Sequence, residues 1–498
     1  MKELQHFIAG RKVAGASGRF CDGFEPMSGA TISRVPLASP EEVNAAVESA
    51  KAAQPGWAAV TPQRRARVLT KFLDLVAREM DPLARLVSQE HGKTLADAEG
   101  DIRRGLDVVE FATGAPHLLK GAFSEGAASA PDLYTLLQPL GVMAGVTPFN
   151  FPAMIPMWMF TPAIACGNAF VLKPSERDAS TPLRLAELML DAGLPPGVLN
   201  VVTGDKEAVD ALLDHPDVEA LSFVGSTAVA EAVYARGASK GKRMQCFGGA
   251  KNHMIVLPDA DLDGAVDALI GAAFGAAGER CMAISVALPV GEATATELVR
   301  RLLPRVKALK VGPSTDPNAD FGPLVTRVHL ERVEHYVALG ASEGAELLVD
   351  GRGLRVAGHE GGFYLGGCLF DRVTRDMRIY REEIFGPVLV VLRAKNYEEA
   401  LALANEHEYG NGVAIFTRDG AVARDFVSRV QVGMVGVNTP IPTPLAHYSF
   451  SGWKRSVFGD LGQHGPDAVR FCTKTKTVTS RWPSAEKEGA SFIMPTTH

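Results

Sequence analysis

The run of residues 274–282, Phe-Gly-Ala-Ala-Gly-Glu-Arg-Cys-Met, places a single thiol where covalent chemistry could occur. Small residues lead up to Cys281, and the permanent positive charge of Arg280 stands directly before it. A thiol attacks as its thiolate, and a neighbouring cation lowers the pKa that controls thiolate formation. Cys281 is therefore a candidate nucleophile, although a lone cysteine is more often a small buried hydrophobic residue.

A second candidate, Asn150, stands inside a long uncharged stretch. Residues 133–172 contain no charged side chain but five prolines. Because proline repeatedly breaks a spanning helix, this stretch predicts buried core and not a membrane segment. A buried amide needs hydrogen-bond partners. Asn150 is either satisfied by the backbone or aimed at a developing oxyanion.

Two motifs after apolar runs suit a nucleotide. Gly225 and Ser226 stand where a strand turns into a helix, and free N–H groups there can bind a phosphate. Lys173 and Glu176 follow another strand and could hold ribose hydroxyls. An ordinary strand–helix turn and a solvated charged turn are the alternatives.

Composition excludes several classes of function. The 498 residues are enough for two or three domains, and the net charge of −6 argues against nucleic-acid binding. The six cysteines lie far apart without a CxxC pair, which favours a reducing compartment. His253, His447 and His464 lack partners at metal-ligand spacing, so we expect no metal site. The N-terminus has no secretory apolar core, and we expect a cytoplasmic protein without membrane contact.

Strands and helices alternate around these motifs. Ser39 is the expected N-cap of a first helix, and Thr181 of a later one. Apolar runs of strand length occur at residues 142–146, 169–172, 198–202 and 220–224. This alternation predicts a doubly wound, mostly parallel sheet. It restarts near residue 255, with strands at 388–392 and 412–416, which predicts a second α/β domain carrying Cys281.

Near the end of the chain, threonines alternate with other residues over positions 473–480. This period-two pattern predicts an exposed strand, and a polar strand beyond both domains suggests pairing with another subunit. We expect the tail after Trp482 to be loose.

In order and spacing, these motifs resemble the aldehyde dehydrogenase family over nearly the whole chain. The matching segments are 148–152, 173–176, 223–227, Cys281 and 382–387. The resemblance implies an α/β fold with a Rossmann-like NAD-binding domain, an α/β catalytic domain and a small β oligomerisation domain. The implied boundaries are 1–116 and 140–248 for NAD binding, 249–468 for catalysis, 117–139 and 469–484 for oligomerisation strands, and 485–498 for the tail.

The resemblance also implies roles for single residues. Cys281 would be the nucleophile, and Asn150 with the Cys281 N–H would form the oxyanion hole. The residues implied to hold NAD are Phe149, Lys173, Glu176, Gly225, Ser226, Glu383 and Phe385. An acid at Glu176 should repel a 2′-phosphate, which favours NAD over NADP. The family further suggests a homotetramer, a dimer of dimers.

One departure from the family concerns the fate of the thioester. Hydrolytic members carry a glutamate base where this chain has Phe247, and without a base water attacks slowly. The segments 249–253, 278–282 and 433–438 are similar to CoA-acylating members that act on malonate and methylmalonate semialdehydes. Those members usually have asparagine in place of Phe247. A hydrolytic enzyme with its base elsewhere, or a non-catalytic relative, are the alternatives.

A semialdehyde of a dicarboxylic acid needs a cationic anchor. The resemblance points to Arg104 and Arg280, because guanidinium groups bind carboxylates in bidentate fashion. The alternative for Arg104 is a helix-surface ion pair with Asp101 or Asp107. The implied reaction is thiol attack, hydride transfer to NAD, loss of CO2 and transfer of the acyl group to CoA.

Overall fold

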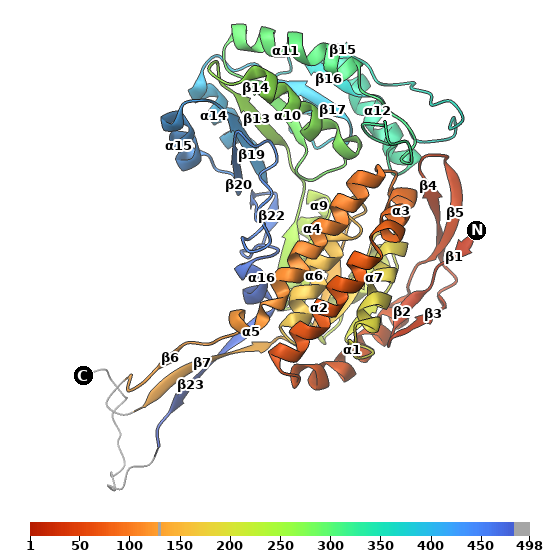
Figure 1. Ribbon diagram of the computed structural model, residues 1–498, viewed down its shortest axis with the longest axis vertical. Coiled ribbons are helices and arrows are strands. Elements are labelled where there is room, and N and C mark those ends of the chain that lie inside the picture. Colours follow the sequence, from red (N-terminus) through yellow and green to blue (C-terminus); the bar gives the residue numbers. More distant parts are fainter. Residues whose placement is uncertain (128–130, 483–498) are drawn as a thin grey trace.

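Two twisted sheets build two large lobes, and a narrow three-stranded arm projects from one of them (Figure 1). The computed structural model describes residues 1–127 and 131–482. The chain enters the lower lobe first, crosses to the upper lobe after residue 250, and returns near its end.

The sheet of the lower lobe has eight strands in the order β22-β12-β11-β8-β9-β10-β2-β3. Its five middle strands run parallel, and the edge strands pair antiparallel. The strands are β2 (His6–Ile8), β3 (Arg11–Val13), β8 (Val142–Val146), β9 (Ala169–Lys173), β10 (Leu199–Val201), β11 (Val218–Val224), β12 (Arg243–Phe247) and β22 (Val457–Phe458). The predicted parallel sheet and its strands are confirmed.

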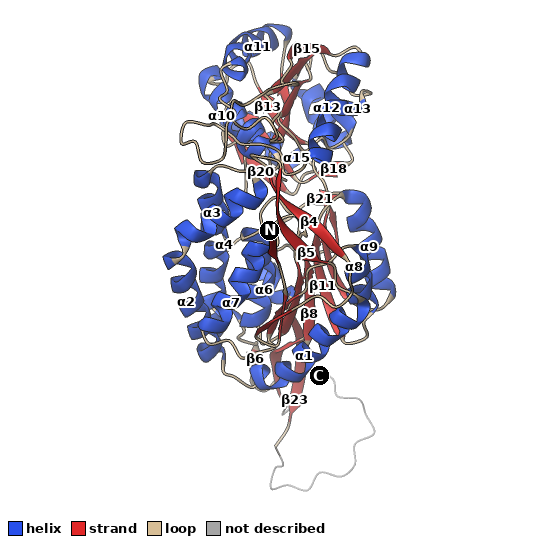
Figure 2. Cartoon of the chain, turned by 90° about the vertical axis from the view of Figure 1, so that its right-hand side faces the viewer, coloured by secondary structure: helices blue, strands red, loops and turns tan. Residues whose placement is uncertain are grey.

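Helices cover both faces of this sheet (Figure 2). One face carries α2 (Pro62–Arg78), α3 (Met80–His91), α4 (Leu95–Thr113), α6 (Met154–Ala165) and α7 (Ser180–Asp191); α5 (Ala115–Leu118) follows α4. The other face carries α1 (Pro40–Ala58), α8 (Lys206–Asp214) and α9 (Thr227–Ser239). Every residue of α6 is buried, as expected for the uncharged stretch. In residues 1–127 and 131–482, no helix has the length and apolar character needed to cross a bilayer.

Of the two helix starts predicted from N-cap residues, one is confirmed and one is wrong. Ser39 caps α1 in a full capping box with Glu42. Thr181 does not cap α7, which begins at Ser180. The Glu90 carboxylate of α3 accepts the Ser180 N–H at 3.1 Å, so a distant side chain replaces the local cap.

The sheet of the upper lobe has the order β15-β16-β17-β14-β13-β19-β20, parallel except for β15. Its strands are β13 (Asn252–Val256), β14 (Ile284–Pro289), β15 (Glu346–Val349), β16 (Cys368–Asp371), β17 (Val388–Val391), β19 (Gly412–Phe416) and β20 (Met434–Val437). Its helices are α10 (Leu262–Phe274), α11 (Glu292–Lys307), α12 (Arg327–Ser342), α13 (Arg378–Arg381), α14 (Tyr397–Glu406) and α15 (Gly420–Arg429). The predicted second α/β unit carrying Cys281 is confirmed.

The remaining strands form small sheets. The arm consists of β6 (Phe123–Ser124), β7 (Asp132–Pro139) and β23 (Thr473–Ser480), which follows α16 (Pro466–Phe471). The exposed strand predicted over 473–480 is therefore confirmed, and it pairs antiparallel with β7 of its own chain. The others are β1 (Lys2–Glu3), β4 (Phe20–Glu25) and β5 (Ala30–Pro36), and β18 (Tyr409–Gly410) with β21 (Trp453–Lys454). The predicted loose tail lies outside the described residues.

Candidate active site

A cavity of about 860 Å³ opens where β8, β9, β11 and β12 end. Strand order reverses between β8 and β11, and open α/β sheets bind ligands at such a switch point. Residues from both lobes line this cavity. It brings together every predicted catalytic and cofactor-binding residue, namely Phe149, Asn150, Lys173, Glu176, Gly225, Ser226, Cys281, Glu383 and Phe385.

The end of the cavity away from Cys281 has the properties of a nucleotide site. Ser226 is the N-cap of α9 and makes no side-chain capping bond, so N–H groups at this helix start remain available for a phosphate. Apolar side chains of α8 and α9, including Leu213 and Val233, line the cavity beside it. The Lys173 ammonium lies 3.3 Å from a Glu176 carboxylate oxygen, and both side chains line this cavity. These groups fit a dinucleotide with an adenine, a ribose and a pyrophosphate.

The loop that carries Cys281 has an unusual backbone. Ala276, Ala277 and Gly278 have φ angles of 50°, 52° and 72°, in the left-handed region that side chains disfavour. A Cβ on Gly278 would lie 2.2 Å from the Gly386 carbonyl oxygen, so this position requires glycine. The run of small residues before the thiol is thus explained by a tight turn packed against the neighbouring loop.

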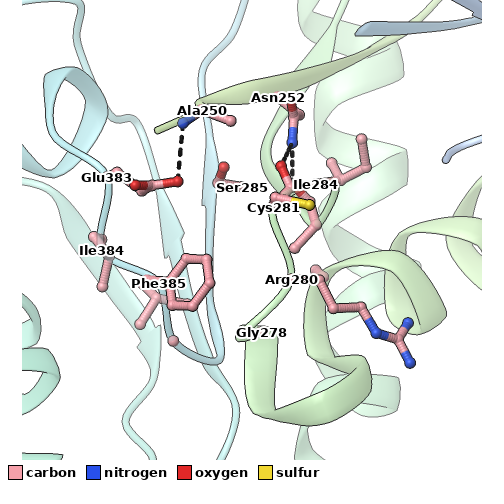
Figure 3. A pocket seen from close by; sticks show the side chains of 14 residues that line it. Ala250, Asn252, Gly278, Arg280, Cys281, Ile284, Ser285, Glu383, Ile384 and Phe385 are labelled. Carbon is pink, nitrogen blue, oxygen red and sulfur yellow. Dashed lines mark hydrogen bonds between the residues drawn. The ribbon is translucent and has the colours of Figure 1, made fainter. Parts of the chain in front are cut away.

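Two asparagine side chains bind the backbone of the thiol-bearing residue. Asn252 and Asn411 donate their Nδ2 groups to the Cys281 carbonyl oxygen at 2.9 and 3.1 Å. Asn252 lies on β13 above Cys281 (Figure 3). The loop is therefore fastened to the sheet of the upper lobe.

The protonation of Cys281 differs from the expectation based on its neighbour. Burial, followed by the negative charge of Glu383, raises the pKa of the Cys281 thiol to about 12, and the opposing effect of Arg280 is smaller. The Arg280 guanidinium lies 2.5 Å from Asp97 and points away from Glu383 and Phe385 (Figure 3). Arg280 lowers the pKa of the thiol, as its position in the sequence predicts, but desolvation and the charge of Glu383 raise that pKa by more.

Opposite the thiol, the loop after α13 presents Glu383 and Phe385. A Glu383 carboxylate oxygen accepts the Ala250 N–H at 2.9 Å (Figure 3), and burial raises the pKa of Glu383. Phe385 has a φ of 63°, and its carbonyl oxygen accepts the Nε2–H of His329 at 2.7 Å. Buried Lys251 donates to the carbonyls of residues 379 and 382 at 2.7 Å, which braces the same loop.

Asn150 is buried, yet its side-chain amide is free. Within residues 1–127 and 131–482, no hydrogen bond uses this amide. Its backbone carbonyl instead accepts the Nζ–H of Lys93 at 2.6 Å. The alternative of a core asparagine satisfied by the backbone therefore lacks support, and the amide is available to a ligand in the cavity.

Aromatic packing occupies the position of the missing base. The ring of Phe247 is buried, with its centroid 5.9 Å from that of Phe450. Phe450 in turn packs against Trp158 at 5.3 Å. No carboxylate can be supplied from residue 247, and the apolar surroundings would resist a charged side chain there.

The two predicted arginine anchors are both engaged by the protein. Arg104 donates to Asp107 at 3.1 Å and to the Pro444 carbonyl at 2.8 Å, which is the helix-surface pairing considered above. Arg280 is paired with Asp97, which lies on α4, the helix that also carries Arg104. Neither arginine lines the large cavity, although Arg280 lines a smaller one next to Cys281. Their role toward a substrate remains a prediction.

Sequence reasoning missed several residues of this site. Asn252 could have been suspected, because it is a polar residue at the start of an apolar strand. Lys93, Asn411 and His329 gave no such signal, since only tertiary packing brings them to the site. Glu48 on α1 lies close to His215 and Asp217 between α8 and β11, and the spacing of these three side chains alone could hold a metal ion. Lys51 and Asn44 already bind members of this cluster.

Fold and site together place a candidate cysteine nucleophile beside a cavity suited to a dinucleotide. The sequence model of the aldehyde dehydrogenase family matches residues 13–478, and the chain belongs to this family. It is 55% identical to malonate-semialdehyde dehydrogenase of Pseudomonas aeruginosa, covering 99% of this chain and 100% of the relative. It is 46% identical to the acylating, mitochondrial methylmalonate-semialdehyde dehydrogenase of Arabidopsis thaliana, covering 99% and 81%.

Solved structures agree with this placement. A proposed methylmalonate-semialdehyde dehydrogenase from Sinorhizobium meliloti 1021, complexed with NAD, superposes with a TM-score of 0.97 at 62% identity, covering 98% of this chain and 99% of that one. Methylmalonate-semialdehyde dehydrogenase from Oceanimonas doudoroffii gives 0.96 at 53% identity, covering 97% and 99%. The predicted family and fold class are confirmed.

Proposed function

We propose that this protein oxidises malonate semialdehyde, methylmalonate semialdehyde or both, with NAD as oxidant and CoA as acyl acceptor. The products are CO2, NADH and acetyl-CoA or propanoyl-CoA. The names of the similar enzymes support the substrates, and the acylating relative supports CoA. The observation that carries the acylating assignment is Phe247, which is buried among aromatic rings and stands at the position that the family resemblance assigns to the hydrolytic base.

The residues that line the large cavity define the orientation that we propose for NAD. Its pyrophosphate would lie at the start of α9 beside Gly225 and Ser226, and its adenosine ribose against Lys173 and Glu176. The nicotinamide ribose would then lie against Glu383. Phe149 and Phe385, whose ring centroids are 5.9 Å apart, would flank the nicotinamide. When bound, NAD accepts the hydride from the substrate carbon.

The chain itself supplies the nucleophile and the charge stabilisation. Cys281 gives up its proton and attacks the aldehyde carbon, and the free amide of Asn150 donates to the resulting oxyanion. Because the pKa of the thiol is raised to about 12, the proton must pass to an acceptor during attack. Glu383 lines the same cavity with a raised pKa and is suited to take it. Loss of the hydride leaves a thioester on Cys281.

The thioester then loses the β-carboxylate as CO2. The electron pair of the broken C–C bond moves into the thioester carbonyl, and the enolate formed takes a proton at carbon. The CoA thiolate attacks the remaining acyl group, and the Cys281 thiolate leaves. With Phe247 in place of a base, water is a poor competitor for this step.

The test is NADH and acyl-CoA formation by the purified protein with each semialdehyde, with and without CoA. We expect a single burst of NADH without CoA and steady turnover with it. Rapid turnover to free acid without CoA would sink the acylating assignment. A Cys281→Ser variant serves as the control for uncatalysed decarboxylation.

Hydrolysis is the second candidate, and one observation favours it. The Glu383 carboxyl group faces the same cavity as Cys281 and has a raised pKa, so it could activate water if NADH moved aside. In that case Glu383→Gln would abolish free-acid formation. We also propose that the protein is a homotetramer located in the cytoplasm.

A further inference from the structure

The segment that carries Asn150 belongs to no helix or strand. It connects the end of β8 with the start of α6, and residues 147–153 belong to neither element. An amide that must meet a developing oxyanion has to be held in place before the reaction, because misplacement by a fraction of an ångström forfeits much of the stabilisation. Something outside the segment must therefore hold it.

The side chain of Lys93 contacts this segment directly. It lies between α3 and α4, and its side chain is 0% exposed. Its ammonium donates to the Asn150 carbonyl at 2.6 Å and lies 4.2 Å from the centre of the Phe151 ring. Burying a lone cation is costly, so a fully enclosed lysine at this place requires compensation.

Asp101 supplies the compensating charge and a second attachment. Its carboxylate lies 3.8 Å from the Lys93 ammonium and is equally enclosed. Its other oxygen accepts the backbone N–H of Met154, the first residue of α6, at 2.7 Å. The cation thus holds one end of the segment 150–154, and the anion holds the other.

We propose that Lys93 and Asp101 are positioning residues that fix the Asn150 amide for stabilisation of the oxyanion. This inference rests on the proposed function, in which Asn150 donates to the oxyanion. A buried ion pair contributes little to stability by itself. Two backbone attachments at the ends of one catalytic segment are instead suited to preorganising the amide.

The test compares Lys93→Met with Lys242→Met. Lys242 makes the same kind of contact far from the site, donating to the carbonyls of His215 and Val218 at 2.5 and 2.6 Å. The readout is the rate of the first NADH burst with malonate semialdehyde at saturating NAD. We expect Lys93→Met to slow the burst by about tenfold to a hundredfold, which is less than the roughly 10²–10³-fold cost of removing an oxyanion donor itself. Lys242→Met should leave it unchanged.

A double-mutant cycle with Asn150→Ala separates positioning from general damage. If Lys93 acts through Asn150, Lys93→Met costs little in the Asn150→Ala background, and Cys281 keeps its rate of labelling by iodoacetamide. Equal slowing in both backgrounds would overturn the inference. If Asn150→Ala alone does not slow the burst, the oxyanion assignment of the proposed function fails instead.

Asp101→Asn provides a second route if Lys93→Met does not fold. Its amide oxygen can still accept the Met154 N–H, so only the charge opposite Lys93 is lost. We expect a burst slower than that of the native protein and again little effect in the Asn150→Ala background. A native burst rate in a folded Asp101→Asn variant would contradict the pairing of the two residues.

Discussion

At the scale of single residues, the protonation of Cys281 governs reactivity. Its pKa is raised to about 12, so the thiol is neutral near neutral pH and the thiolate fraction grows with pH. We expect the rate of iodoacetamide labelling at Cys281 to rise about tenfold per pH unit from about pH 7 to pH 9. Mass spectrometry of the peptide carrying Cys281 measures this rate. A plateau below pH 9 would mean a more acidic thiol than desolvation and the charge of Glu383 allow.

Arg104 and Arg280 are the residues predicted to bind the substrate carboxylate. Loss of a charged hydrogen bond to the substrate costs about 1.5–3 kcal/mol, so Arg104→Gln and Arg280→Gln should each raise KM for the semialdehydes by about tenfold or more. KM for butanal, which has no carboxylate, should stay the same.

Arg103→Gln is the matched control for these two variants. Arg103 neighbours Arg104 on α4 but is exposed and lies 3.3 Å from Glu99. Its replacement should leave KM for both substrates unchanged. An equal rise for butanal in the Arg104 or Arg280 variants would indicate structural damage and contradict the anchor.

At the scale of elements, helix α4 contributes both to core packing and to the surroundings of the site. It carries Asp97, Asp101 and Arg104. Gly105 on the same helix lets α6 approach closely, since an added Cβ would lie 3.2 Å from the backbone Cα of Met154 and 2.1 Å from Met157 Cε. We expect Gly105→Ala to destabilise the protein by about 1–3 kcal/mol through overpacking. Chemical denaturation measures the change.

The same substitution in another helix should have the opposite sign. Gly271 lies in α10, where an added Cβ would meet nothing within 4 Å. Gly271→Ala should stabilise the protein by about 0.5–1 kcal/mol, because alanine loses less backbone entropy in a helix. Destabilisation by Gly271→Ala would show that α10 is not formed as described.

At the scale of the whole molecule, the arm is the expected contact between subunits. Leu136 on β7 and Phe123 on β6 are 42% and 65% exposed in the single chain, and large apolar side chains on a projecting arm favour association. Leu136→Asp and Phe123→Asp should convert the expected tetramer into smaller species. Size-exclusion chromatography with light scattering measures the mass.

Val427→Asp is the control for the arm variants. Val427 is 50% exposed on α15, and we expect no subunit contact there. This variant should keep the mass of the native protein. Tetramers of native mass in both arm variants would contradict assembly through the arm.

Much of the fold was predictable because its signals are local. The strand at Val142–Val146 follows from five consecutive apolar or small residues, and the start of α1 follows from Ser39 and Glu42 three residues apart. The order of the motifs was enough to assign the family, because each motif is short and complete in itself. The start of α7 was missed because Glu90, 90 residues away, caps it.

The residues predicted to bind the cofactor and to react were visible in the sequence, but their chemical state was decided by tertiary structure. The sequence alone determined that a thiol, an asparagine and a phenylalanine in place of the family's base occur in one chain. Packing decided that the pKa of the thiol is raised, that Arg280 pairs with Asp97, 183 residues away, and that Lys93 donates to the Asn150 carbonyl. Burial and charge pairing depend on neighbours brought together by folding, and no local pattern encodes them.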